Sequence, residues 1–441
     1  RINRRQRQMC IRDRYVTFLI YCLNIMEEFF LSPYLILAIA AILGLFMAWG
    51  IGANDVANAM GTSVGSKALT LKQAIIIAAI FEFLGAYLAG GEVTSTIRKG
   101  IVDPQLYVND LNIFIIGMMS SLLAAGFWLY IASNNGWPVS TTHSIVGAIV
   151  GFVLITKGID AVSWFTVGEI ASSWITSPLI AGILAFLIYL SAKKLILNAK
   201  NQVTAAIFYI PFYSFLVAGV IAQVVARKGL SHIGLSWNDN EIWFFTALIA
   251  LLVGGVTSLA LRLNKESISS QGGIEYAFGI LMIVTACAMA FAHGSNDVAN
   301  AIGPVAAIIS VVNSNDLSST APINPAILLL GGAGIVLGLT TLGYKVIKTV
   351  GEKITKLTPS LGFSAEMAAA STVVFASYLG FPISTTHTLI GGVIGVGLAN
   401  SAKDLDWSSV YRIFASWIIT IPIGAVFTIL FYVFLRVIFN V

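Results

Sequence analysis

Two polar motifs, each present twice, stand inside long apolar stretches of this sequence. Residues 52–61 read GANDVANAMG, and residues 294–303 read GSNDVANAIG. Spacings of three and four residues place the carboxylate and amides of each copy on one face of a helix. These residues are Asn54, Asp55 and Asn58 in the first copy, and Asn296, Asp297 and Asn300 in the second. Their oxygen atoms suit a hard cation such as Na⁺, and the alternative is a polar contact that only joins helices.

The second motif is PVSTTH at 138–143 and PISTTH at 382–387. Proline and three hydroxyl residues before a long apolar run are typical of a helix that begins within the membrane. Such a terminus offers free N–H groups and a partial positive charge. The predicted anion-binding residues are Ser140, Thr141, Thr142, Ser384, Thr385 and Thr386. Neither copy contains Lys or Arg, and the alternative is ordinary helix capping.

Four more ionisable residues are candidates for ion coupling. Glu82 lies well inside an apolar run, and ionisable residues at membrane depth are costly and often functional. Glu366 stands at the edge of another run, where it could instead favour a helix N-terminus. His143 and His387 end the two hydroxyl motifs, and each could carry a proton or simply form a packed hydrogen bond.

The elements that must position these residues are membrane helices. The chain has 441 residues, of which 57% are hydrophobic and 10% charged, whereas about a quarter are charged in a soluble domain. Runs near the roughly 20 residues needed to cross a bilayer lie at 32–50, 73–91, 112–133, 143–156, 168–191, 204–226, 241–261, 275–293, 325–343, 366–380, 386–400 and 413–437. We therefore predict an all-α polytopic membrane protein with about twelve transmembrane helices.

The order of the motifs indicates a duplicated unit. The second copies begin 242 and 244 residues after the first, and Trp174 and Pro178 are matched by Trp417 and Pro422. We predict a first repeat at 30–191, two connecting helices and loops within 192–274, and a second repeat at 275–437. An inverted arrangement of the repeats is the expectation for a transporter.

The basic balance of the chain does not indicate a nucleic-acid partner. The formal net charge of +5 equals the sum over residues 1–14, which hold six Arg and one Asp. This tail lacks the apolar core of a signal peptide, and we interpret it as a candidate non-native extension. The spacing of the three cysteines predicts no disulfide or metal framework. No catalytic metal, nucleotide or nucleophile motif is present, so neither an enzyme nor a resident cofactor is expected.

With both paired motifs, the sequence resembles the inorganic phosphate transporter (PiT) family over about 30–437. Further agreement comes from TIRKG at 96–100 and LTPS at 357–360. The resemblance implies a homodimeric phosphate symporter with inverted repeats, phosphate between the two Ser-Thr-Thr segments and sodium at the Asn-Asp motifs. It favours the sodium-coupled branch and a multi-pass protein of the prokaryotic inner membrane, that is, the plasma membrane. The alternatives are proton-coupled or metal-phosphate symport and, less favoured, an anion channel or receptor.

Overall fold

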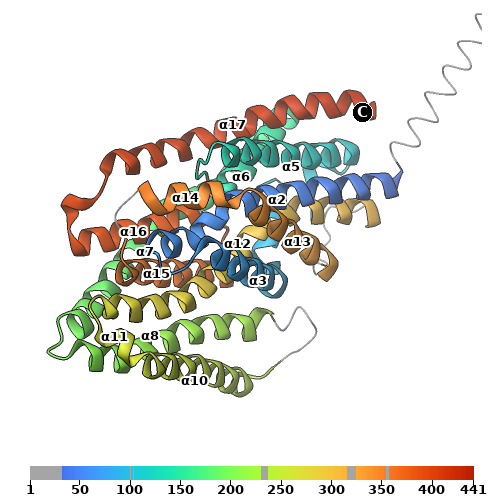
Figure 1. Cartoon of the computed structure of the whole chain (residues 1–441). Helices are drawn as coiled ribbons and strands as arrows, with labels where there is room; N and C mark the ends of the chain where they lie inside the picture. The colour runs from blue at the N-terminus through green and yellow to red at the C-terminus, as the bar shows by residue number, and fades with distance from the viewer. Residues whose placement is uncertain (1–31, 100, 103, 230–236, 315–323, 354–356) are drawn as a thin grey trace, which may run out of the picture.

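The computed structural model describes residues 32–441 except 100, 103, 230–236, 315–323 and 354–356 (Figure 1). The described chain is nearly all helix, which confirms the predicted all-α class. The basic tail at 1–14 lies outside the described residues, as do Cys10 and Cys22.

Two series of six helices follow the same order along the chain. The first series is α2 (Pro33–Gly65), α3 (Leu71–Ala89), α4 (Gly91–Lys99), α5 (Leu111–Asn134), α6 (Thr141–Lys157) and α7 (Trp164–Ala192). The second is α12 (Gly273–Ser314), α13 (Pro325–Thr341), α14 (Gly343–Lys353), α15 (Pro359–Tyr378), α16 (Thr385–Asn400) and α17 (Trp407–Phe439). Between them lie α8 (Gln202–Val224), α10 (Asp239–Leu263) and the short α11 (Lys265–Ser269).

A helix occupies each of the twelve predicted positions, but they do not all span a membrane alone. Eight described helices are long and apolar enough to do so, or nine if α13 and α14, bent by 66°, form one broken span. The helices α6, α15 and α16 do not meet that condition. This agrees with the prediction that some helices begin within the membrane.

Some predicted boundaries were wrong because polar residues interrupt the apolar runs. The predicted spans 32–50 and 275–293 stop before the Asn-Asp motifs, whereas α2 and α12 continue through them to Gly65 and Ser314. Likewise α15 begins at Pro359, so Glu366 lies in its second turn and not at its N-terminus. Hydrogen bonds to neighbouring helices keep these buried polar residues inside regular helix.

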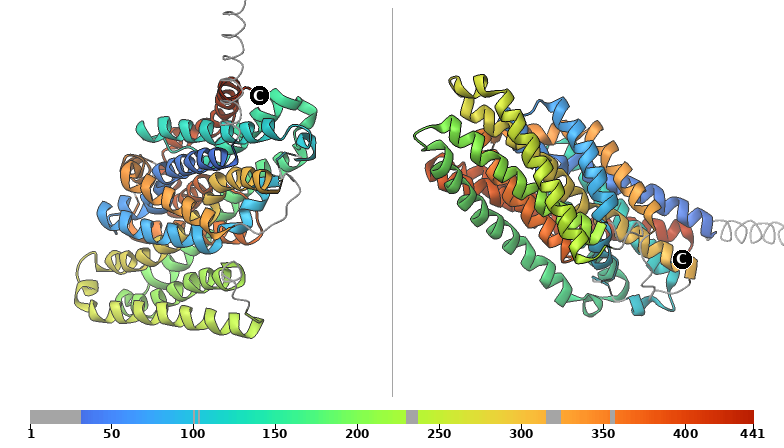
Figure 2. Two further views of the ribbon diagram at one scale, coloured as in Figure 1. Left: turned by 90° about the vertical axis from the view of Figure 1, so that its right-hand side faces the viewer. Right: turned by 90° about the horizontal axis from the view of Figure 1, so that it is seen from below.

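Helices of one series pack closely against helices of the other series. Helix α2 lies against α13 and α12 against α3, while α6 lies against α17 and α7 against α16. In Figures 1 and 2 the pair α8 and α10 forms one edge of the bundle, and α17 lies on the opposite side. The division into two repeats stays a prediction, and this reciprocal packing supports it.

Glycines allow helices of the two series to approach each other until their backbones are in contact. A Cβ on Gly147 would lie 2.3 Å from the Ile421 carbonyl oxygen of α17. A Cβ on Gly391 would lie 2.2 Å from the Pro178 carbonyl oxygen of α7. Small residues at such contacts are a general means of close helix packing in membranes. As a result, α6 and α16 are held tightly against helices of the other series.

A glycine turn precedes each of the helices that begin with the hydroxyl motif. Gly136 follows α5 with φ +66°, and Gly380 follows α15 with φ +75°. Glycine adopts this left-handed conformation without the cost that a Cβ imposes. These turns reverse the chain so that α6 and α16 begin close to α2 and α12.

Candidate functional site

The first asparagine of each Asn-Asp motif ties its long helix to the turn before α6 or α16. The Asn54 amide donates to Ser133 Oγ at 3.2 Å and to the Trp137 carbonyl at 2.9 Å. Asn296 makes the corresponding pair of bonds in the second series. Its acceptors are Ser377 Oγ at 3.0 Å and the Phe381 carbonyl at 3.2 Å. Hydrogen bonding thus explains why an asparagine is tolerated at these buried positions.

The two aspartates accept hydrogen bonds from the starts of α6 and α16. Thr141 Oγ1 donates to Asp55 Oδ2 at 2.7 Å, and Thr385 Oγ1 donates to Asp297 Oδ2 at the same distance. Each aspartate therefore contacts the hydroxyl motif of its own series. The sequence predicted both motifs, and the structure brings them together.

The second asparagine of each motif crosses to the other series. The Asn58 amide donates to Thr385 Oγ1 at 3.3 Å and to Thr386 Oγ1 at 2.8 Å. The Asn300 amide reaches the matching residues of the first series. Its acceptors are Thr141 Oγ1 and Thr142 Oγ1, both at 3.3 Å. The four motifs consequently form one site in which each long helix contacts both α6 and α16.

The N-termini of α6 and α16 meet within this site. Ser140 Oγ accepts from the His143 N–H and Ser384 Oγ from the His387 N–H, both at 3.2 Å. Both serines are thus helix caps, as the alternative interpretation proposed. A capping serine still has its own O–H to donate, and the first N–H groups of each helix have no partner within that helix. Capping therefore leaves donors for an anion at both termini.

The threonine hydroxyls are engaged in other contacts in this conformation. Besides the bonds to the aspartates, Thr142 Oγ1 donates to the Ile383 carbonyl at 3.1 Å. Thr386 Oγ1 lies 3.4 Å from the Val139 carbonyl oxygen, which is its acceptor. A phosphate held by these hydroxyls would have to compete with those acceptors.

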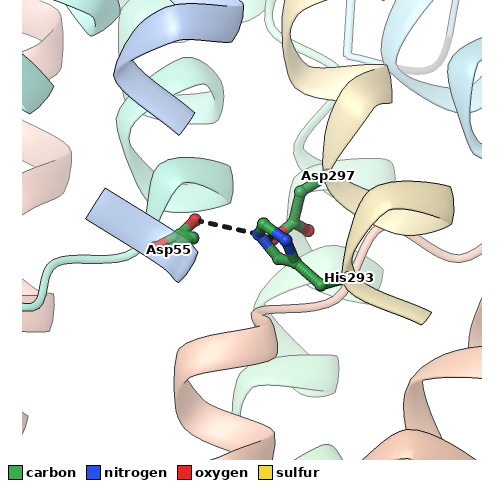
Figure 3. Close-up of side chains that lie close together, drawn as sticks. All are labelled: Asp55, His293 and Asp297. Atoms are coloured by element: carbon green, nitrogen blue, oxygen red, sulfur yellow. Dashed lines mark ion pairs between the residues drawn. The ribbon is translucent and has the colours of Figure 1, made fainter. Parts of the chain in front are cut away.

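A histidine that the sequence did not single out lies between the two aspartates (Figure 3). His293 Nε2 is 3.0 Å from Asp297 Oδ2 and 3.9 Å from Asp55 Oδ2. Its other ring nitrogen, Nδ1, is 3.3 Å from Glu82 Oε1 on α3. All four side chains are buried. His293 directly precedes the second Asn-Asp motif, where Ile51 precedes the first, and this difference between the copies was the available signal.

Several buried oxygen atoms of the site have no hydrogen-bond donor among the described residues. They are Asp297 Oδ1, Asn296 Oδ1, Asn300 Oδ1 and both carboxylate oxygens of Glu82. An unpaired buried acceptor costs free energy, and three carboxylates here face a single imidazole. Oxygen atoms of this kind fit a bound cation, which would both coordinate them and balance their charge.

Glu366 lies in a separate cluster of hydroxyl groups. Its Oε1 accepts from Thr62 Oγ1 and from Ser63 Oγ at 2.6 Å, and its Oε2 accepts from Thr285 Oγ1 at 2.7 Å. Glu82 shares none of these partners. The structure thus places the two glutamates in different surroundings, one beside the aspartates and one among hydroxyls.

His143 and His387 contact each other across the junction of α6 and α16. Their ring centroids are 4.5 Å apart. Each Nδ1 lies 3.1 Å from a tryptophan carbonyl oxygen, of Trp417 and of Trp174 respectively. These contacts favour a packing and positioning role over proton transfer to the carboxylates.

The helices and the buried site define a polytopic membrane transporter. Comparison with known proteins agrees, because residues 51–428 match the model of the phosphate transporter family. The chain is 49% identical to a putative phosphate permease of Haemophilus influenzae, over 91% of this chain and 97% of that protein. It is 43% identical to the chloroplastic inorganic phosphate transporter 2-1 of Arabidopsis thaliana, over 88% of this chain and 70% of that one.

A solved structure of the sodium-dependent phosphate transporter matches with a TM-score of 0.85 and 40% identity, covering 91% of this chain and 99% of that one. The chain belongs to the phosphate transporter family. The family resemblance that the motifs predicted is therefore confirmed. Since this is a family of permeases, the prediction that the chain is not an enzyme is confirmed as well.

Proposed function

We propose that the protein is a secondary symporter that imports inorganic phosphate together with sodium. One observation carries the sodium assignment: buried oxygens of Asp297, Asn296 and Asn300 lack donors beside a cluster of carboxylates. We propose that these oxygen atoms bind Na⁺, as do those of the first-series counterparts Asn54, Asp55 and Asn58. The solved sodium-dependent relative supports this choice of ion.

Phosphate is proposed to bind between the starts of α6 and α16. Free N–H groups and the partial positive charge of two converging helix N-termini favour an anion without any lysine or arginine. The hydroxyls of Ser140 and Ser384, and those of the four adjacent threonines, supply further donors. Since Thr141 and Thr385 now bond to the aspartates, sodium at the aspartates would release these two hydroxyls for the anion.

The burial of the site supports transport by alternating access. All twelve proposed sodium- and phosphate-binding residues of the four motifs are at most 2% exposed, so neither ion can enter without movement of helices. An unpaired charge at mid-membrane costs at least about 2.5–3.5 kcal/mol. Two aspartates plus phosphate would therefore cross poorly without cations, which couples the loaded state to sodium. Glu82 and Glu366 remain candidates for this coupling.

The direct test is radiolabelled phosphate uptake into proteoliposomes, with an inward sodium gradient compared with choline at fixed pH. Uptake in sodium alone would support the proposal. Uptake in choline driven by a proton gradient, with a steep pH dependence, would favour the proton-coupled or metal-phosphate alternative. Continuous conduction under voltage clamp, or binding without saturable uptake, would instead indicate a channel or receptor, a reading that the closed site disfavours.

Three broader properties belong to the same proposal. We infer two repeats of inverted topology, a homodimer, and a location in a prokaryotic inner membrane. The reciprocal contacts of α2 with α13 and of α12 with α3 support the repeats. Mass measurement of the protein in nanodiscs would test the dimer, and accessibility labelling of introduced cysteines on both sides of the membrane would test the topology.

A further inference from the structure

The ligand set around His293 differs from that of a site designed for sodium alone. Asp55, His293 and Asp297 each offer one ligand atom, and these three atoms lie within 4.8 Å of one another. An imidazole nitrogen is a preferred ligand of zinc and other transition metals, whereas sodium and other hard cations favour oxygen. Zinc accepts both imidazole nitrogen and carboxylate oxygen, and three protein ligands leave a fourth position open.

The two distances from His293 to the aspartates lie near the spacing that such an ion requires. Zinc bonds of roughly 2.0–2.1 Å place two tetrahedral ligand atoms about 3.3 Å apart. His293 Nε2 lies 3.0 Å from Asp297 Oδ2 and 3.9 Å from Asp55 Oδ2, on either side of that value. Both nitrogens of this fully buried ring lack a hydrogen bond of regular geometry among the described residues. Nε2 of this ring is thus aimed at the pair of aspartates (Figure 3).

Glu82 supplies the outer partner that metal-binding histidines usually have. Its Oε1 lies 3.3 Å from His293 Nδ1, the nitrogen that faces away from the aspartates. A carboxylate in this place would favour the proton on Nδ1 once a metal is bound, which leaves the Nε2 lone pair for the metal and makes the imidazole a stronger ligand. The first series has Ile51 in the place of His293, so this site has no counterpart at the matching position of the first motif.

We propose that Asp55, His293 and Asp297 form a binding site for one divalent transition-metal ion, with Zn²⁺ as the best match. The ion takes Asp55 Oδ2 and Asp297 Oδ2 and leaves a fourth position open. Because sodium is proposed to use the same carboxylates, bound zinc excludes it and inhibits uptake. The metal site rests on the geometry alone, and only the competition rests on the proposed function.

Cobalt(II) titration tests the metal site without requiring transport. The purified full chain in phosphate-free detergent buffer should give the visible absorption bands of protein-bound Co²⁺, saturating at one equivalent per chain and displaced by Zn²⁺. His293→Gln should lose the bands, and His293→Cys should restore binding with an added sulfur charge-transfer band. Glu82→Gln should weaken Co²⁺ binding by about 10–100-fold, as loss of an outer carboxylate does elsewhere.

His143→Gln is the matched control, because it removes another buried histidine of the same region. This variant should keep the wild-type Co²⁺ spectrum. Absence of bands in the wild type, or bands unchanged in His293→Gln, would overturn the metal site. Bands that Na⁺ fails to weaken would overturn the competition while leaving the metal site in place, and a lack of sodium-dependent uptake would count against the proposed function only.

Discussion

At the scale of single residues, the two halves of the site match in their aspartates and differ in His293. Each aspartate accepts a hydrogen bond from a threonine at the start of α6 or α16. Only Asp297 has an imidazole nitrogen at 3.0 Å. The two cation positions are therefore unequal, even though the motifs around them are nearly identical.

Asp55→Asn and Asp297→Asn should each reduce sodium-dependent phosphate uptake to the level of empty liposomes. The amide keeps an oxygen that can accept from Thr141 or Thr385, so both proteins should still insert and fold, but the negative charge that holds Na⁺ is lost. Uptake in proteoliposomes checks this, and the exposed Asp160→Asn is the control expected to behave as wild type. Wild-type sodium activation in both variants would refute the cation assignment.

The double variant Ser140→Ala with Ser384→Ala should raise the apparent KM for phosphate by about tenfold or more. The estimate follows from the roughly 1.5–3 kcal/mol of a hydrogen bond to a charged group, where 1.4 kcal/mol is tenfold. Concentration-dependent uptake gives the KM.

The double variant with glycine separates this effect from capping. Glycine as N-cap costs only a few tenths of a kcal/mol, whereas alanine costs about 0.5–2 kcal/mol. Both doubles should raise KM equally, although the alanine double should lose more thermal stability. If KM stays unchanged in the glycine double, Ser140 and Ser384 act as caps alone.

At the scale of helices, the site depends on how closely α6 and α16 approach their partners. Gly391 and Gly395 of α16 face α7, and Gly147 and Gly151 of α6 face α17. These contacts set where the two helix N-termini meet. Backbone contacts at these glycines thus help to position the proposed anion site.

Gly391→Ala should destabilise the protein by about 1–3 kcal/mol, as expected for overpacking, and should lower uptake. Its Cβ would meet the Pro178 carbonyl oxygen at 2.2 Å, and backbone atoms cannot move aside without shifting α7. Thermal unfolding in detergent checks stability. Gly255→Ala in α10 is the matched control, because its Cβ would have no neighbour within 4 Å. Equal melting temperatures for the two variants would contradict this account of the contact.

At the scale of the whole molecule, neither series can complete the site alone. Asn58 bonds to threonines of the second series, and Asn300 bonds to threonines of the first. The apolar packing depends on both series as well, because helices of one series pack against helices of the other. A separated half would leave these buried amides without acceptors and expose the packing faces of its helices.

Co-expression of the chain as two pieces, divided between Asn264 and Lys265, should give a complex that co-purifies through a tag on one piece. Each piece expressed alone should aggregate or be degraded, because its buried polar groups lack partners. The pair should recover part of the sodium-dependent uptake of the intact chain. A single piece that is stable and monodisperse would show that the two series are not interdependent.

Composition and spacing were enough to predict the helical membrane class and the polar faces of the motif helices, and the resemblance of the motifs to a known family predicted the family. These properties are local, because hydropathy sets membrane insertion and three- or four-residue spacing sets which side chains share a helix face. Runs of apolar residues predicted helices that end before the polar motifs of α2 and α12. Hydropathy does not take account of the hydrogen bonds that Asn54 and Asn296 form with other helices.

The tertiary structure alone decided which motifs meet. Spacing cannot show that Asn58 reaches Thr386, that Glu82 lies beside His293, or that Glu366 lies apart among hydroxyls. Each of these contacts joins residues from different helices, 211 or more positions apart for the first two pairs. Helix packing sets such distances. Here the packing includes close glycine contacts between helices of the two series. The sequence therefore determined the chemical groups of the site, and packing between the two series determined their geometry.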